Sequence, residues 1–316
     1  MTDSHVADSH VAVHPSSSFR EIAIVAPTAS GKSDVAMAVA RTTGAHIVAV
    51  DAMQVYRGMD IGTAKPTVAD RAEVVHHCID VVNPDERFTV AEFKTHSAAA
   101  RTTISQSGAH TVFVAGTGLY LTAVIDDLQL PGEWPAVRAE LQSEDDVAVL
   151  FARLVELDPL AASRTDKSNR RRIERALEVC IGSGKPFSSF GPGTGAYPPS
   201  DVRQVGLSWP RATLSARIER RVHAMMAGGF LREVQALVST FTLSREARQA
   251  LGYRELLAHL DGEISLDEAV AQMVLHTRQF AVRQERWFRR DPRIEWLAIH
   301  DDPVAEAAPL LLAMLR

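Results

Sequence analysis

The stretch from Glu21 to Ser33 constrains the fold of this chain more than any other. Its first apolar residues, Ile22 to Val25, indicate a buried strand, and a tight turn then leads into Gly31-Lys32-Ser33 at the start of an amphipathic helix. In that arrangement the backbone N–H groups of the turn and the positive end of the helix converge on one oxyanion. Lys32 neutralises charge there, and the Ser33 hydroxyl can hold Mg²⁺. The stretch therefore predicts a phosphate-binding loop.

The phosphate-binding loop departs from the usual pattern at its first position, where Ala26 replaces glycine. Alanine fits there only if its φ angle stays negative. The strand before the loop and the helix after it supply the context that a bare match lacks. The residues assigned to the loop are Ala26, Pro27, Thr28, Ala29, Ser30, Gly31, Lys32 and Ser33.

Strands and helices alternate through much of the chain. We predict further strands at His46–Asp51, Cys78–Val82, Thr111–Ala115 and Val202–Leu207. Their alternation with helices indicates an α/β fold, a P-loop NTPase-like parallel sheet core with helices on both faces. Ligands bind at the carboxyl edge of such a sheet. Asp51 ends one strand at that edge, and Thr117 follows another in a Gly-Thr-Gly turn.

Capping boxes mark the starts of two helices, Thr89 with Glu92 and Ser265 with Glu268. The second helix is predicted to extend as far as Arg290. On it Arg283, Arg286 and Arg290 are spaced by three and four residues, so they share a face. These arginines suit either an RNA phosphate backbone or ion pairs within the protein.

Composition divides the chain into a core, an insertion and two ends. After Pro131-Gly132 the pattern is only helical, and the glycines and prolines between Gly191 and Pro199 indicate a linker. We expect a catalytic core over 19–130 and 198–300, a small all-helical insertion over 131–197 and a C-terminal helix over 301–316. Residues 1–18 contain a tandem Asp-Ser-His-Val-Ala repeat with little to bury, so we expect a disordered tail.

The formal net charge of −5 argues against a protein that coats nucleic acid without specificity. Two local basic clusters, 164–175 and 278–293, can nevertheless grip a phosphate backbone. No apolar stretch has the length of a membrane helix, and the N-terminus lacks the features of a signal peptide. The two cysteines, Cys78 and Cys180, are too few for a disulfide framework, so we expect a cytoplasmic protein.

Three classes of function remain open on these residues. A P-loop kinase of a small molecule would use Lys32 on the ATP phosphates and Asp51 on substrate or metal. A regulatory NTPase or motor needs a hydrophobic strand that ends in Asp. The strand Thr111–Ala115 ends in Gly instead, although Asp51 could fill that role. A transferase would hold a diphosphate leaving group in the loop while an RNA base attacks.

Several short motifs along the chain resemble those of one family. They are Asp51-Ala-Met-Gln-Val-Tyr-Arg-Gly-Met-Asp-Ile-Gly-Thr-Ala-Lys-Pro66, His76-His77 with Ile79-Asp80, Gly116-Thr-Gly-Leu-Tyr120, Arg175-Ala-Leu-Glu-Val179, Gly252-Tyr253, Thr277-Arg-Gln, Arg283-Gln284 and Trp287-Phe288. Together they are similar to the tRNA dimethylallyltransferases, from about Ile22 to Trp296. The chain departs from that family at Ala26, at Ala52, where Ser is usual, and at Ser168–Arg171, which lacks the usual Asn-Asp-Pro-Gln-like run.

The resemblance implies transfer of a dimethylallyl group from its diphosphate to N6 of the adenosine just 3′ of a tRNA anticodon, with Mg²⁺. The partners would be the tRNA anticodon stem-loop and dimethylallyl diphosphate, and we expect a monomer that binds no membrane. Asp51 is our candidate general base, with metal ligation as its alternative role. Thr117 would hydrogen-bond the bridging oxygen or the base. By similarity Arg221 would be a further diphosphate contact.

The target base must leave its stack to reach such a site. Gln54 is suited to receive it by hydrogen bonds, and Met53 and Tyr56 by packing. Arginines of the insertion would contact the anticodon stem, unless they form a solvated helix face. The expected tRNA-binding residues are Asp51, Ala52, Met53, Gln54, Tyr56, Thr117, Arg171, Arg172, Ile173, Glu174 and Arg175.

Overall fold

The computed structural model describes residues 20–315, so the tail predicted over 1–18 lies outside the described residues. The elements in chain order are β1 (Glu21–Val25), α1 (Lys32–Thr43), β2 (His46–Val50), α2 (Val68–Glu73), β3 (His76–His77), α3 (Val90–Ser107), β4 (Thr111–Ala115), α4 (Gly118–Ile125), α5 (Pro135–Gln142), α6 (Val147–Leu157), α7 (Pro159–Ser163), α8 (Arg170–Ser183), the 3₁₀ helix η1 (Phe187–Phe190), β5 (Arg203–Ser208), α9 (Arg211–Ala227), α10 (Phe230–Thr240), α11 (Arg245–Arg248), α12 (Tyr253–Leu260), α13 (Leu266–Phe288), β6 (Ile294–Ala298) and α14 (Pro303–Met314).

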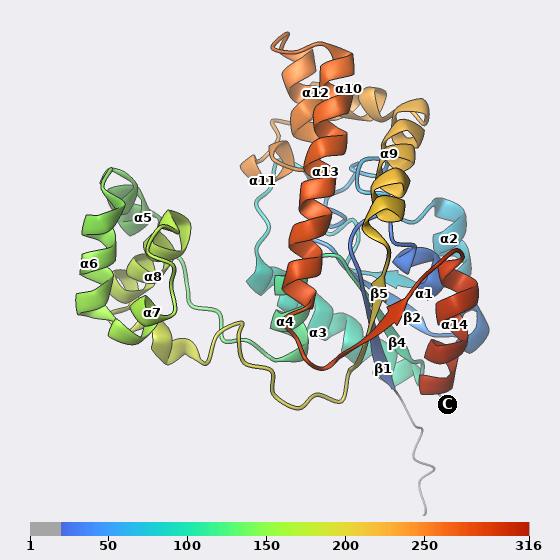
Figure 1. The fold of residues 1–316 in the computed structure, drawn as a ribbon, viewed down its shortest axis with the longest axis horizontal. Coiled ribbons are helices and arrows are strands. Elements are labelled where there is room, and N and C mark those ends of the chain that lie inside the picture. The colour runs from blue at the N-terminus through green and yellow to red at the C-terminus, as the bar shows by residue number, and fades with distance from the viewer. Residues whose placement is uncertain (1–19, 316) are drawn as a thin grey trace, which may run out of the picture.

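The strands of residues 20–315 form one parallel sheet in the order β3-β2-β4-β1-β5-β6. Side chains alternate across β1, so Ile22 and Ile24 pack with α1 and α14 on one face. Ala23 and Val25 pack on the other face, in a core that also draws on α3, α4, α12 and α13. The predicted α/β fold, a parallel sheet covered on both faces, is confirmed (Figure 1).

One strand was predicted in the wrong place. We expected Cys78–Val82, but the strand that pairs with β2 is His76–His77. Cys78 and Asp80 have φ angles of 63° and 52°, in the left-handed region that interrupts a strand. The Asp80 carboxylate instead accepts hydrogen bonds from Lys65 and Arg71. These ion pairs, together with backbone hydrogen bonds from Asp80 and Val81 to residues 54 and 55, hold this segment outside the sheet.

Both predicted capping boxes are present, at the starts of α3 and α13. The helix α13 ends at Phe288, close to the predicted end. None of the helices in the described part of the chain combines the length and the apolar character needed to cross a bilayer.

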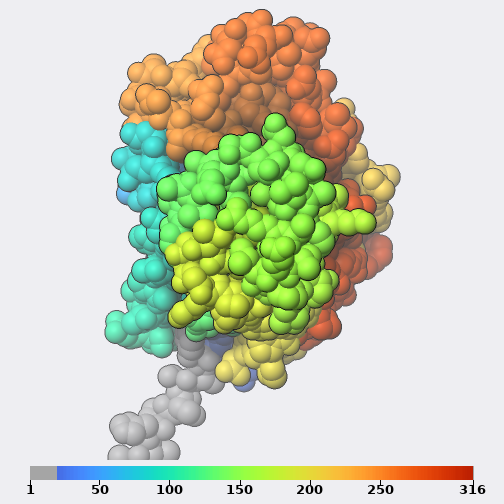
Figure 2. Space-filling view, turned by 90° about the vertical axis from the view of Figure 1, so that its left-hand side faces the viewer, coloured from blue at the N-terminus to red at the C-terminus, as the bar shows by residue number. Residues whose placement is uncertain are grey.

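The segment predicted as a helical insertion contains α5, α6, α7, α8 and η1, which share an apolar core of their own. One face of α8 lies in that core, with Ile173, Ala176, Leu177 and Cys180 buried. Figure 1 places these helices to the left of the sheet, joined to it by two extended connections. Seen from that side they form a lobe in front of the core (Figure 2).

Candidate active site

The phosphate-binding loop joins β1 to α1, and side chains from other parts of the chain form hydrogen bonds to its backbone. Gly31, the N-cap of α1, has a φ angle of 87°, which glycine adopts without strain. The carbonyl of Ala29 accepts a hydrogen bond from Arg217 Nε at 2.8 Å, and the carbonyl of Ser30 accepts one from Trp209 Nε1 at 2.9 Å. Ala26 is absent from the non-glycine residues with positive φ in residues 20–315, so alanine meets the condition for that position.

Two partly buried cations lie beside this loop. Lys32 and Arg221 both line the cavity beside it. Burial, followed by repulsion from Arg221, lowers the pKa of Lys32 to about 8. Burial also lowers the pKa of Arg221. A multiply charged anion between the two groups would relieve both effects, which is what a phosphate site requires.

Asp51 follows β2 and uses its two carboxylate oxygens differently. Oδ1 accepts hydrogen bonds from the backbone N–H groups of Met53 at 2.8 Å and Gln54 at 3.3 Å. Oδ2 has no hydrogen-bond partner among residues 20–315. The carboxylate is therefore oriented through one oxygen, and the other remains available to a ligand.

Thr117 lies beside Asp51 because its N–H and that of Gly116 bond to the carbonyl of Val50, the last residue of β2. The Thr117 Oγ1 atom accepts a hydrogen bond from the N–H of Ala52 at 3.1 Å. Since that bond occupies a lone pair, the hydroxyl proton is left to donate into the cavity.

Three side chains converge on Gly116, at the end of β4. A Cβ atom placed on this glycine would lie 3.3 Å from Asp51 Oδ2, 3.3 Å from Gln284 Nε2 and 3.7 Å from Lys32 Cε. A strand-end carboxylate and the phosphate-loop lysine thus approach the same point. Such an arrangement can bind a diphosphate and take a proton at neighbouring positions.

A cavity of about 1230 Å³ opens from this point. It extends from the phosphate-binding loop past Met53 and Gln54 to side chains of α10, α12 and α13. The half-buried aromatic rings of Phe280 and Trp287 line it as well. The cavity is large enough for a diphosphate and a base together.

Comparison with known proteins identifies the family. A model of the IPP transferase family matches residues 54–291, and a model described as isopentenyl transferase matches residues 20–78. A protein of Paenarthrobacter aurescens (strain TC1) named tRNA dimethylallyltransferase is 43% identical over 291 residues, which are 91% of this chain and 93% of the relative. This chain belongs to the IPP transferase family.

Solved structures of the IPP transferase family share the fold. The full-length tRNA isopentenylpyrophosphate transferase of Bacillus halodurans is 33% identical, with a TM-score of 0.68 over 94% of this chain and 96% of that one. A eukaryotic dimethylallyltransferase described as acting on tRNA is only 24% identical and shows the fold alone, with a TM-score of 0.79 over 94% of this chain and 78% of that one. The family suggested by the sequence motifs is therefore confirmed.

Gln284 is a functional candidate that belongs to one of the family motifs but had no predicted role in the site. Its Oε1 accepts a hydrogen bond from the N–H of Thr28 at 2.9 Å, and its Nε2 donates to the carbonyl of Gly116 at 2.7 Å. This buried amide of α13 joins the phosphate-binding loop to the end of β4. The signal in the sequence was a polar residue on the buried stripe of α13, between Ala281 and Phe288.

Tyr56 does not reach the cavity. Its side chain is 1% exposed and packs in the core of the sheet, so the predicted packing against the base is wrong. Met53 and Gln54 do line the cavity. The aromatic side chains of Phe280 and Trp287 on α13 line the cavity, whereas Tyr56 does not.

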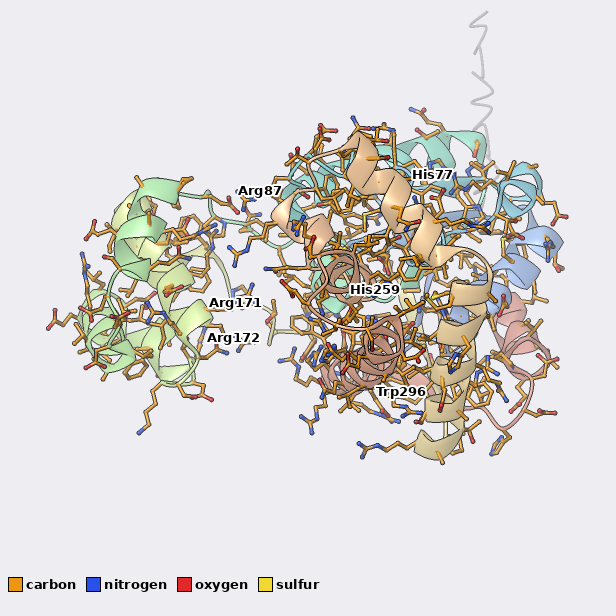
Figure 3. All side chains as sticks on the ribbon, turned by 90° about the horizontal axis from the view of Figure 1, so that it is seen from above. His77, Arg87, Arg171, Arg172, His259 and Trp296 are labelled. Atoms are coloured by element: carbon orange, nitrogen blue, oxygen red, sulfur yellow. The ribbon has the colours of Figure 1, made fainter. Side chains whose placement is uncertain are left out.

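The arginines at the start of α8 have different surroundings. Arg171 and Arg172 are exposed, and Figure 3 shows them on the side of the insertion that faces the core. Ile173 is wholly buried, so its prediction as a tRNA contact is wrong. Glu174 is paired with Arg170. Arg175 bonds to the carbonyl of Pro131 and pairs with Glu178, and its side chain remains partly exposed.

The arginines predicted to share a face of one helix are open to solvent, and Arg290 lies just beyond the end of α13 at Phe288. Arg283, Arg286 and Arg290 are exposed, and none of them forms an ion pair within residues 20–315. The Arg290 guanidinium lies 4.4 Å from the ring centroid of Trp287. Of the two uses that the sequence left open for these arginines, internal ion pairing does not occur in the described part of the chain.

Proposed function

We propose that this protein transfers a dimethylallyl group from dimethylallyl diphosphate to N6 of the adenosine just 3′ of the anticodon in tRNA. The products are N6-dimethylallyladenosine and diphosphate. The convergence of Asp51, Lys32 and Gln284 on Gly116 is the observation that carries this proposal. It puts a carboxylate beside a phosphate-binding loop, as an attack by an exocyclic amine on a diphosphate ester requires.

In the proposed reaction the N6 nitrogen attacks C1 of the dimethylallyl group while the bond from C1 to the bridging oxygen breaks. The N6 proton passes to Asp51 Oδ2, since Oδ1 is already held by two backbone N–H groups. The Thr117 hydroxyl donates to the bridging oxygen. Lys32, Arg221 and the backbone N–H groups of the loop stabilise the charge that develops on the leaving diphosphate.

A divalent cation fits the residues of this site. Ser33 and Asp51 line the same cavity, whereas residues 20–315 contain no group of three or more His, Cys, Asp or Glu side chains that could enclose an ion. Mg²⁺ suits such a sparse set because it keeps several waters and binds substrate phosphates. The Ser33 hydroxyl would hold the ion, which would neutralise charge on the diphosphate.

The tRNA would lie between the core and the insertion. Met53 and Gln54 would receive the flipped adenine in the cavity that they line. Arg171 and Arg172 would contact phosphates of the anticodon stem from the facing side of the insertion. We further propose that the enzyme is monomeric and cytoplasmic.

The test is a direct assay of the product. Purified protein is incubated with dimethylallyl diphosphate, Mg²⁺ and unmodified tRNA, and the digested RNA is examined by mass spectrometry for N6-dimethylallyladenosine. A parallel reaction contains ATP in place of the isoprenoid. Modified nucleoside in the first reaction alone supports the transferase. Its absence, with consumption of ATP in the second reaction, would indicate a kinase or NTPase instead.

A further inference from the structure

Glu233, in the first turn of α10, binds the backbone of the loop between β2 and α2. Its carboxylate accepts hydrogen bonds from the N–H groups of Asp60 at 3.0 Å, Ile61 at 2.6 Å and Gly62 at 3.2 Å. The hydroxyl of Tyr253 donates to the same carboxylate at 2.6 Å. Because hydrogen bonds to a charged acceptor are stronger than neutral ones, this carboxylate is a firm anchor for the turn.

We propose that Glu233 is a positioning residue for the adenosine of tRNA. It would act through the loop from Asp51 to Pro66, without contact with the substrate. This inference rests on the proposed function, since it concerns how the same site receives its base.

Packing enforces the same position of the loop. A Cβ atom on Gly62 would lie 2.3 Å from the ring of Phe230 and 2.5 Å from that of Tyr253. The two rings meet edge to face, with centroids 4.9 Å apart. The loop backbone is therefore pressed against α10 and α12 at the point where the Glu233 carboxylate binds it.

The anchored turn also determines the orientation of the Gln54 side-chain amide. The Nε2 atom of Gln54 donates to the carbonyls of Thr63 at 3.1 Å and Ala64 at 3.4 Å. Carbonyl groups only accept hydrogen bonds, so they determine which end of the amide carries the N–H groups. The Oε1 atom is then left to accept a hydrogen bond from an amine in the cavity that Gln54 lines, such as N6 of adenosine.

A second anchor keeps the loop folded when Glu233 is changed. The buried Lys65 ammonium donates to Asp60 Oδ1 at 2.6 Å, to Asp80 Oδ1 at 2.7 Å and to the carbonyl of Tyr56 at 2.7 Å. Substitution of Glu233 should thus loosen the turn at 60–64 without unfolding the loop. The phosphate-binding loop is bonded to other side chains, Gln284, Arg217 and Trp209, so binding of the diphosphate should be spared.

The experiment separates the two substrates. Steady-state kinetics with an anticodon stem-loop RNA would be measured for the wild type and for Glu233→Ala, Glu233→Gln and Tyr253→Phe. We expect the KM for RNA to rise about tenfold or more for Glu233→Ala and less for the other two variants, because each of these keeps part of the anchor. The dissociation constant for dimethylallyl diphosphate should stay within about twofold of wild type.

Glu219→Gln is the matched control, because Glu219 is an exposed residue of α9 paired only with Arg278 in the described structure. It should leave both constants unchanged. An unchanged RNA KM in the Glu233 variants, or equal weakening of both substrates, would overturn the inference. If Glu233→Ala does not fold, Glu233→Gln and Tyr253→Phe decide the question alone. A wild-type protein that makes no modified nucleoside would refute the proposed function, whereas an active wild type with unaffected variants refutes only this inference.

Discussion

Diphosphate binding should weaken as the pH rises through 8, because of Lys32. Burial and the neighbouring Arg221 lower the pKa of this lysine from 10.5 to about 8. A bound diphosphate places negative charge beside the ammonium group and raises its pKa again. When Lys32 is deprotonated in the free protein, diphosphate binding must be accompanied by uptake of a proton on this amine. Above pH 8 this protonation lowers the affinity for the diphosphate.

The magnitude follows from the pKa. Between pH 7 and pH 9 the protonated fraction of Lys32 falls from about nine-tenths to about one-tenth in the free protein. We expect the Kd for dimethylallyl diphosphate to rise about tenfold over that range, which is about 1.4 kcal/mol. The ligand changes its charge little in this window, since the second pKa of a phosphate group lies near 6.

Titration calorimetry in two buffers of different ionisation enthalpy measures both the Kd and the proton uptake, which should be about half a proton at pH 8. The matched control is Lys32→Arg, because a guanidinium keeps its charge over the whole range. A wild-type Kd that stays constant from pH 7 to pH 9 would refute the reasoning. So would an equal rise in the Lys32→Arg variant.

Four further predictions test other parts of the site. Gln284→Ala removes two hydrogen bonds, each worth about 1 kcal/mol, so steady-state assays should show kcat/KM lowered about tenfold or more. Unchanged kinetics would mean that the hydrogen bonds of Gln284 to Thr28 and Gly116 are not needed for activity. Asp51→Asn should abolish prenyl transfer yet leave the Kd for the diphosphate nearly unchanged, whereas lost binding would indicate metal ligation. Combined Arg171→Ala and Arg172→Ala should raise the KM for tRNA and reduce the salt slope of binding by about 0.7 to 0.9 per lost contact, and an unaltered slope would leave both arginines in solvent. Gly31→Ala puts a Cβ atom 2.4 Å from a proline ring at a φ angle of +87°, so thermal unfolding should show a loss of about 1 to 3 kcal/mol, and wild-type stability would contradict that strain.

Local patterns in the sequence predicted the parts of the site that lie at strand ends. The phosphate-binding loop, Asp51 and Thr117 each follow a short apolar run, and parallel strands bring such positions to one edge of a sheet. The capping boxes of α3 and α13 were equally readable, because each depends on residues three positions apart. These features need only nearby residues to form.

The errors arose where distant groups compete with a local pattern. The apolar run at Cys78–Val82 suggested a strand, yet its backbone bonds to residues 54–57 and Asp80 pairs with Lys65 and Arg71. Tyr56 belongs to a motif of the family, but its ring packs into the core beneath the motif. In both cases a residue's neighbours in the sequence did not reveal its neighbours in the fold.

The sequence alone was sufficient to indicate the parallel sheet, the phosphate-binding loop, the catalytic candidates at the strand ends and the family. Only the tertiary structure decided which groups hold these parts in place. Gln284 reaches Thr28 across 256 residues of chain, and Glu233 reaches Gly62 across 171. The physical reason is that hydrogen bonds within one turn or one strand end follow from local backbone geometry. A hydrogen bond between a helix and a loop that are distant in the sequence forms only after the core has packed and brought its two partners together.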